Sequence, residues 1–325
     1  MAESERITPR ARLIINADDL GYASERDDGI LACHAAGGVT SASLLVNGAS
    51  ARSALARAVQ AGLPVGLHVN LTEGAPVSAA TAVRSLLAPP GCTRFRGKHG
   101  LREALARGEV LLDEVATEAR AQLSRFRALH PRGGAPSHYD GHQHVHVLPG
   151  ILEVLVEVLG GHAGGVRACR LPASREAELV GLPAERAAFY AGIGSQSREA
   201  AALLARKGIV TPVAFLGYST MGADASVARG LAAVEEAVAE VERMEKASSS
   251  AAPLVIEWMV HPGYRTRPRP HLGDAAQAEG EEGAGCGDGP DDFAQDAGRE
   301  QEMRMLCDPA LLEGLRVAGV ALAAF

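Results

Sequence analysis

The chain has 325 residues, of which 47% are hydrophobic, so it can form one large α/β barrel or two smaller domains. Its net charge of −7 and its aromatic content of 4% disfavour a nucleic-acid-binding protein, which needs a basic face or a stacking platform. The five cysteines are widely spaced, the N-terminus is polar and no apolar run is long enough to cross a membrane, so we expect a cytoplasmic protein without a signal peptide or membrane partner.

The first predicted strand ends in two carboxylates. A polar tail at residues 1–10 precedes an apolar run over Leu13 to Ala17, which predicts a buried strand. This strand ends in Asp18 and Asp19. Adjacent side chains of an extended chain point to different sides, so one carboxylate could bind a metal while the other stays free as a base. The alternative is a pair of capping residues for the next helix.

Extended and helical patterns then alternate through the first half of the chain. We expect strands at 39–46 and 65–69, helices at 25–36, 51–61 and 113–129, and a loop over the mouth of the sheet at 75–100. His68 lies near the end of its strand. A lone histidine in an apolar strand is usually a core residue, but a second polar group at a strand end favours a functional role.

The densest cluster of chemical groups lies between residues 137 and 149, which contain four of the eleven histidines. In an extended chain Asp140, His142, His144 and His146 share one face. Imidazole nitrogens beside a carboxylate are typical ligands of a divalent metal. The strand is expected to end near Asp140 to His142, which leaves His144 and His146 in the connection to a helix. The alternative is a histidine-rich surface loop with adventitious metal affinity.

The second half of the chain continues the alternation. Strands are predicted at 166–171, 210–216, 254–260 and 320–324, and helices at 151–159, 197–207, 226–246, 303–306 and 311–317. Residues 173–195 carry no strong signal. Arg170 and His261 lie at strand ends. Residues 265–298 are rich in glycine and acidic residues and predict a mobile insertion within the domain, because no second core follows them.

Strands that alternate with helices predict a parallel sheet. Seven or eight such units favour a single-domain, TIM-like (β/α) barrel that spans 11–325. Catalytic groups of such barrels lie at the C-terminal ends of several strands. The polar residues expected at such ends are Asp18, Asp19, His68, His142, Arg170 and His261.

The ordered strings of this sequence are similar to a known family. They are LIINADDLGY, VTSASLLVNG, VGLHVNLTEG, PSHYDGHQHVHVLPG, CRLP and MVHPGY. Together they resemble the YdjC-type carbohydrate deacetylases, also called the ChbG group, and GPDDF with the residues after it resembles the animal members most. The resemblance runs from Leu13 to the C-terminus and is weakest across 173–200 and 265–285. It implies a variant (β/α) barrel and metal-dependent N-deacetylation of acetylated amino sugars or chito-oligosaccharides.

The resemblance also implies roles for individual residues. The metal triad of the family falls on Asp19, His68 and His142, its base falls on Asp18, and His261 in the His-Pro-Gly string corresponds to the general acid. In such a reaction the metal polarises the amide carbonyl, Asp18 takes the proton of the attacking water, and His261 protonates the leaving amine.

Arg170 corresponds to a polar residue of the site wall and is expected to bind substrate. The family resemblance implies one divalent ion, Mg²⁺, whereas two histidine ligands favour Zn²⁺ on ligand softness. A homodimer is compatible with the sequence. Two other functions stay open: another metal-dependent barrel hydrolase, such as a phosphodiesterase, and a non-catalytic sugar-binding protein.

Overall fold

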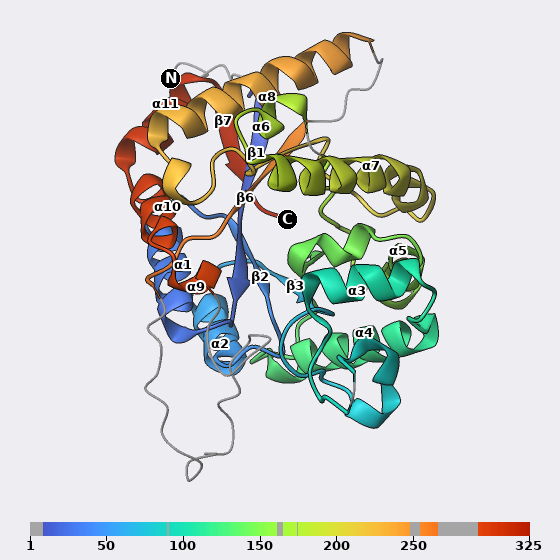
Figure 1. Cartoon of the computed structure of the whole chain (residues 1–325). Helices are drawn as coiled ribbons and strands as arrows, with labels where there is room; N and C mark the ends of the chain where they lie inside the picture. Colours follow the sequence, from blue (N-terminus) through green and yellow to red (C-terminus); the bar gives the residue numbers. More distant parts are fainter. Residues whose placement is uncertain (1–8, 90, 161–164, 174, 248–253, 266–291) are drawn as a thin grey trace.

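The protein folds as a curved parallel sheet with helices around it (Figure 1). The computed structural model describes residues 9–89, 91–160, 165–173, 175–247, 254–265 and 292–325. The strands are β1 (Ala11–Leu20), β2 (Ser41–Leu44), β3 (Val65–Val69), β4 (Tyr139–Gly141), β5 (Ala214–Leu216), β6 (Val255–Val260) and β7 (Val320–Ala323). Their order is β4-β3-β2-β1-β6-β5, and β7 pairs with β1.

β1 is the centre of the sheet. One of its edges pairs with β6 from Arg12 to Ala17. The other edge pairs first with β7, over Ala11 to Ile14, and then with β2, from Asn16 onward. Every residue of β1 except Arg12 is buried. A strand covered on both faces must be apolar along its length, which explains the unbroken run in the sequence.

Helices pack around the outside of the sheet, with α1, α2, α10 and α11 on the left and α3, α4 and α5 on the right of Figure 1. The helices are α1 (Ser24–Ala35), α2 (Ala51–Ala61), α3 (Gly97–Ala106), α4 (Leu112–Leu129), α5 (Ile151–Leu155), α6 (Glu176–Leu179), α7 (Ala184–Arg206), α8 (Val227–Ala247), α9 (Asp292–Gln295), α10 (Gly298–Leu306) and α11 (Pro309–Val317). Among these described helices none is both long and apolar enough to cross a membrane.

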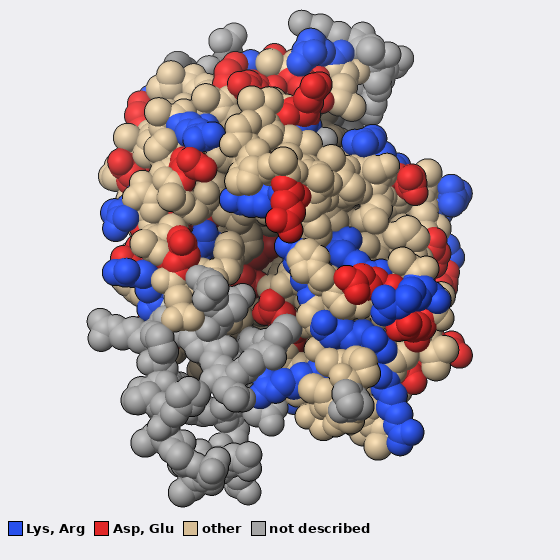
Figure 2. Space-filling model, viewed as in Figure 1, with Lys and Arg blue, Asp and Glu red and all other residues tan. Residues whose placement is uncertain are grey.

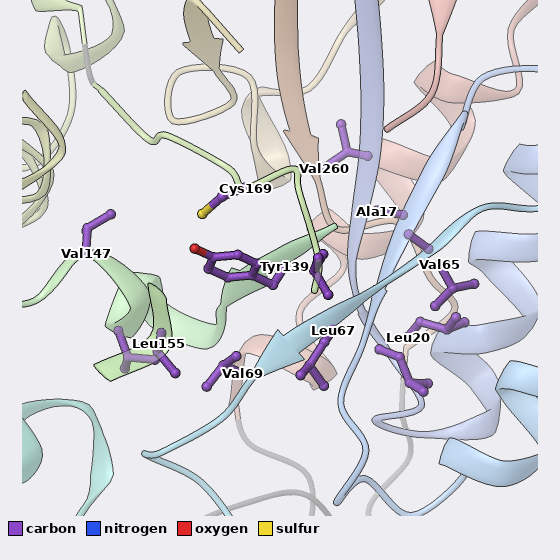
Figure 3. Close-up of a cluster of buried hydrophobic side chains, with 14 of the residues drawn as sticks. Ala17, Leu20, Val65, Leu67, Val69, Tyr139, Val147, Leu155, Cys169 and Val260 are labelled. Carbon is purple, nitrogen blue, oxygen red and sulfur yellow. The ribbon is translucent and has the colours of Figure 1, made fainter. Parts of the chain in front are cut away.

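The core lies between these helices and the sheet. Figure 3 shows part of it, in which Leu67 and Val69 of β3 belong to the same apolar cluster as Tyr139 of β4 and Leu155 of α5. The buried area of such aliphatic side chains supplies most of the stabilisation of a domain. This packing fixes the C-terminal ends of β1, β3 and β4 relative to one another.

The parallel α/β sheet agrees with the prediction, but a complete TIM-like barrel is not formed by the described residues. Residues 166–171, which the sequence predicted as a strand, make only isolated bridges, from Cys169 to Tyr139 and from Ala168 to Val210. Pro172 follows and has no N–H group, so it cannot continue a hydrogen-bond ladder. The segment therefore connects β4 to Val210, which precedes β5, through single residues only.

β1 ends in Asp18, Asp19 and Leu20, so the two carboxylates lie at the end of the strand as expected. Two other expectations differ from the structure. α7 begins at Ala184, inside the segment that carried no signal, because its apolar residues do not lie on one face. The predicted loop at 75–100 contains two short 3₁₀ turns and the start of α3. Residues 266–291 of the predicted insertion lie outside the described residues, whereas 292–298 contain α9 and the start of α10.

Candidate metal centre

Asp18 and Asp19 lie at the C-terminal end of β1, where the strand bulges. The register of β1 against β2 shifts between Ala17 and Leu20, and Asp19 has a left-handed backbone with a φ of 65°. Such a conformation costs a non-glycine residue about 1–3 kcal/mol and clusters at functional sites. The bulge overturns the expectation that the two side chains point to different sides, because both line the same cavity.

Three side chains from three strand ends meet at Oδ1 of Asp19. His142 Nδ1 lies 3.0 Å from this oxygen and His68 Nε2 lies 3.4 Å from it. All three side chains are buried. The structure thus brings together the residues that the sequence analysis assigned to a metal: Asp19 in β1, His68 in β3 and His142 directly after β4.

This donor set fits a divalent cation. The possible ligand atoms of Asp19, His68 and His142 all lie within 4.8 Å of one another. Asp19 Oδ1 is buried and receives no well-aligned hydrogen bond within the described part of the chain, although two imidazole nitrogens face it. Two nitrogens and one carboxylate oxygen would leave coordination positions for water and a substrate carbonyl. These three residues could therefore hold one such ion.

A carboxylate lies on the far side of each imidazole. Asp140 Oδ1 is 2.7 Å from His68 Nδ1, and its other oxygen accepts a hydrogen bond of 2.6 Å from the Ser43 hydroxyl. Glu73 Oε2 lies 3.3 Å from His142 Nε2. Both imidazoles are therefore flanked by a carboxylate on the side away from Asp19.

The electrostatics of the cluster favour positive charge. Burial lowers the pKa of His68, but the nearby Asp140 and Asp18 outweigh it and raise this pKa to about 9. Burial by itself would raise the pKa of Asp19, yet His142, His68 and Arg26 hold it well below the usual range. A site that attracts protons to its imidazoles in this way also attracts a metal ion, with which the protons compete.

A buried arginine, Arg170, binds the Asp18 carboxylate. The two terminal nitrogens of Arg170 each donate a hydrogen bond of 2.6 Å to one oxygen of Asp18. Arg170 Nε donates to Glu257 Oε1 at 2.7 Å. The Arg170 side chain has no exposed surface and does not line the cavity. This position disagrees with the expectation that Arg170 binds substrate at the site wall, because Asp18 lies between it and the cavity.

His261 reaches the site from the end of β6. Its Nε2 lies 3.8 Å from Asp18 Oδ2, and its backbone N–H donates a hydrogen bond of 2.6 Å to Glu302. The Phe293 ring packs edge-on against the imidazole with centroids 5.2 Å apart. Burial lowers the pKa of His261 to about 3, although Asp18 and Asp19 act to raise it. At neutral pH the free protein therefore contains a neutral His261.

The other two histidines of the cluster are not arranged as ligands of this centre. His146 is fully buried and its Nε2 lies 3.2 Å from the carbonyl oxygen of Arg170. His144 lines the cavity, and its Nε2 lies 3.4 Å from the hydroxyl of Tyr218. Burial lowers the pKa of both imidazoles, to about 3 for His146.

The candidate centre opens into a cavity of about 290 Å³. Figure 2 shows a hollow near the middle of the visible face, with acidic side chains inside it. The cavity wall combines aromatic, apolar and cationic side chains. These include Tyr22, Lys98, Phe189, Tyr190, Met221 and Phe293.

Several residues of the centre were not assigned a role from the sequence. Asp140 was noticed only as part of the histidine cluster, and Glu73 and Arg26 were not singled out. Glu257 offered a usable signal, because it is the one charged residue of β6, whose other residues are apolar. A single charge in a buried strand indicates a partner elsewhere in the fold.

Comparisons with known proteins show which family model and which proteins this chain is similar to. A family model described as "YdjC-like protein" matches residues 12–316. The carbohydrate deacetylase of Mus musculus is 42% identical over 97% of this chain and 94% of its own length. The carbohydrate deacetylase of Homo sapiens is 43% identical over 97% of this chain and 90% of its own length.

A bacterial protein and a solved structure are also similar to this chain. The chitooligosaccharide deacetylase of Serratia marcescens is 35% identical over 60% of this chain and 74% of its own length. A crystal structure of a proposed cellobiose-phosphate cleavage protein from Enterococcus faecalis V583 superposes with a TM-score of 0.66. It covers 97% of both chains at 22% identity, which supports a shared fold.

Proposed function

The chain belongs to the YdjC-like family, and we propose that it is a metal-dependent carbohydrate deacetylase that hydrolyses the N-acetyl group of acetylated amino sugars or chito-oligosaccharides. The observation that carries this proposal is the convergence of Asp19, His68 and His142 beside a separate carboxylate, Asp18. The curated relatives named as carbohydrate deacetylases, which align with nearly the whole chain, support the same reaction.

Asp19, His68 and His142 would hold one divalent cation, which when bound would polarise the amide carbonyl and lower the pKa of a water molecule. The family resemblance favours Mg²⁺, whereas the two imidazoles favour Zn²⁺. The buried Asp140 would keep the His68 ring in place. The proposed ligands lie in or directly after separate strands of one sheet, so the site would be formed before substrate arrives.

Asp18 would act as the general base. Its Oδ2 lies 4.0 Å from His68 Nε2, beside the metal ligands. The paired hydrogen bonds from Arg170 and a third from Asn16, at 2.9 Å, hold the carboxylate in one orientation. A base with a fixed orientation can take the proton of the attacking water without further reorganisation.

His261 would protonate the leaving nitrogen, because an amine leaves as a neutral molecule only if it gains a proton. The low pKa of His261 means that the free protein does not carry this proton at neutral pH. The proton would instead arrive during the reaction, and Asp18 Oδ2, at 3.8 Å from Nε2, is the nearest carboxylate oxygen to supply it. We therefore propose a transfer of one proton from water to Asp18, then to His261, then to the amine.

The cavity wall suits a carbohydrate. Tyr22, Phe189 and Phe293 offer aromatic surface, and Lys98 offers hydrogen-bond donors for hydroxyl groups. Concave sites of this kind combine apolar walls with a few fixed polar groups that orient the ligand.

Acetate release from N-acetylglucosamine oligomers tests the proposal. The protein would be assayed as purified, after treatment with a chelator, and after Mg²⁺ or Zn²⁺ is added back. We expect acetate to be released, lost with the chelator and restored by one of the metals. Sugar binding without acetate release would indicate a non-catalytic protein. Hydrolysis of a phosphodiester without amide hydrolysis would indicate the other barrel hydrolase.

A further inference from the structure

Glu73 lies on the loop after β3 and reaches across to the residues that follow β4. Its Oε1 accepts a hydrogen bond of 2.6 Å from the Gln143 side chain, and its Oε2 lies 3.3 Å from His142 Nε2. We propose that Glu73 is a positioning residue, which fixes the tautomer and the ring orientation of His142 for the metal. This inference rests on the metal centre of the proposed function.

The loop holds Glu73 in one place. The side-chain oxygen of Asn70 accepts hydrogen bonds of 3.0 Å from the backbone N–H groups of Thr72 and Glu73. The side-chain amides of Asn70 and Asn47 donate to the Glu73 carbonyl oxygen, at 2.9 and 3.2 Å. Glu73 is only 6% exposed. A buried acid on a loop braced in this way has few alternative directions in which to point.

The consequence for His142 follows from the two nitrogens of a neutral imidazole. Glu73 Oε2 and His142 Nε2 are both buried and have no aligned hydrogen bond among the described residues, so each is available to the other. If Nε2 carries the proton and turns it toward Glu73, Nδ1 keeps its lone pair, and Nδ1 is the atom 3.0 Å from Asp19 Oδ1. His68 shows the reverse arrangement, with Nδ1 facing Asp140 and Nε2 facing Asp19. Each histidine of the triad therefore has its own carboxylate on the nitrogen that faces away from the centre.

The alternative is a purely structural role for Glu73. Gln143 and His144 both have left-handed backbones, with φ of 53° and 60°. The bond from Gln143 to Glu73 could simply stabilise this strained turn, without any effect on the metal. The two roles use different oxygens of Glu73, so they can be separated by substituting Glu73 and Gln143 one at a time.

The experiment measures Co²⁺ and Zn²⁺ affinity by competition with a chelator, together with the visible spectrum of the Co²⁺ form. We expect Glu73→Ala to weaken metal binding about 10–100-fold, as is typical for the outer partner of a histidine ligand, and to change the Co²⁺ spectrum. Glu73→Gln keeps an acceptor oxygen and should recover part of the affinity. Gln143→Ala should change the affinity much less than Glu73→Ala.

Glu118→Gln is the matched control. Glu118 is also a buried carboxylate, and it accepts hydrogen bonds of 2.8 and 2.9 Å from the backbone of Val77 and Ser78, a few residues beyond Glu73. Its substitution disturbs the same loop without touching His142, so wild-type metal affinity in this variant supports the proposal. Equal losses in Glu118→Gln and Glu73→Ala would overturn it.

Two further outcomes separate this inference from the proposed function. Wild-type metal affinity and an unchanged Co²⁺ spectrum in Glu73→Ala, with only a lowered Tm, would overturn the role of Glu73 and leave the triad intact. Wild-type affinity in His142→Ala would show that the triad itself is wrong, and the proposed function would fail with it.

Discussion

Replacing Arg170 distinguishes two possible roles of this residue, which are orienting the proposed base Asp18 and binding the substrate. The side chain is fully buried and neutralises three carboxylates: Asp18 at 2.6 Å, Glu257 at 2.7 Å and Asp140 at 3.2 Å. Breaking one buried ion pair by removal of a partner costs about 3–5 kcal/mol. A domain has a total stability of only about 5–15 kcal/mol. Arg170→Met is therefore expected to unfold the protein or to leave it barely stable.

Arg170→Lys is the informative variant, because it retains the positive charge. An ammonium group cannot donate two parallel hydrogen bonds to Asp18, so the carboxylate would lose its fixed orientation. We expect a folded, metal-binding protein whose kcat falls about 10²-fold, a loss that a misplacement of about 1 Å can cause. KM should change little, because Arg170 does not line the cavity.

The assay for Arg170→Lys is acetate release over a range of substrate concentrations, with metal content and Tm measured in parallel. A raised KM with wild-type kcat would refute the positioning role, and it would restore the role in substrate binding that the sequence suggested. Loss of metal would mean that Arg170 acts through the centre as a whole and not through Asp18.

Three other predictions follow from the same geometry. Asp18→Asn should retain the metal and lose about 10²–10⁴-fold in turnover, whereas Asp19→Asn should lose the metal, so equal metal contents in the two variants would contradict this division of roles. His261→Ala should slow an acetamide far more than an activated acetate ester, whose leaving group needs no proton; equal losses on both substrates would exclude His261 as the proton donor. Burial lowers the pKa of His138 from 6.5 to about 3, so its contribution to stability is complete above pH 6.5 and is lost as the pH falls toward 3, by about 1.4 kcal/mol per pH unit. Between pH 7 and pH 5 this residue should thus lower the free energy of unfolding by about 2 kcal/mol, as measured by chemical denaturation. The free energy of unfolding of His138→Asn should fall less between the two pH values. An equal fall in the variant and the wild type would contradict the lowered pKa of His138.

The sequence predicted the positions of the site residues better than their environment. Asp19, His68 and His142 were among the candidates because polar residues at the ends of apolar parallel strands gather at one edge of a sheet, and the family resemblance singled out these three. Their partners were not recognisable, because Asp140 and His68 are 72 residues apart and Glu73 and Gln143 are 70 residues apart. Such pairs depend on how neighbouring strands are aligned, which one sequence does not specify.

The incomplete barrel has a similar cause. The composition of residues 166–171 is that of a strand, and its central residues do make parallel bridges. However, Cys169 bridges to Tyr139 while Ala168 bridges to Val210, so the segment contacts each neighbour through single residues only. Strand propensity measures how well side chains fit a sheet, and it does not predict how many backbone hydrogen bonds a segment forms with its neighbours.

The bulge at the end of β1 explains how two adjacent aspartates can serve one reaction. In a regular strand Asp18 and Asp19 would face opposite sides of the sheet, and one of them would be buried against the helices. The left-handed backbone of Asp19 and the shift in register turn both carboxylates toward the same imidazole, with His68 Nε2 at 3.4 Å from Asp19 and 4.0 Å from Asp18. Different neighbours then divide their roles. Asp19 faces two imidazoles, which suits the proposed role of a ligand, whereas Asp18 is held by Arg170, which suits the proposed role of a base.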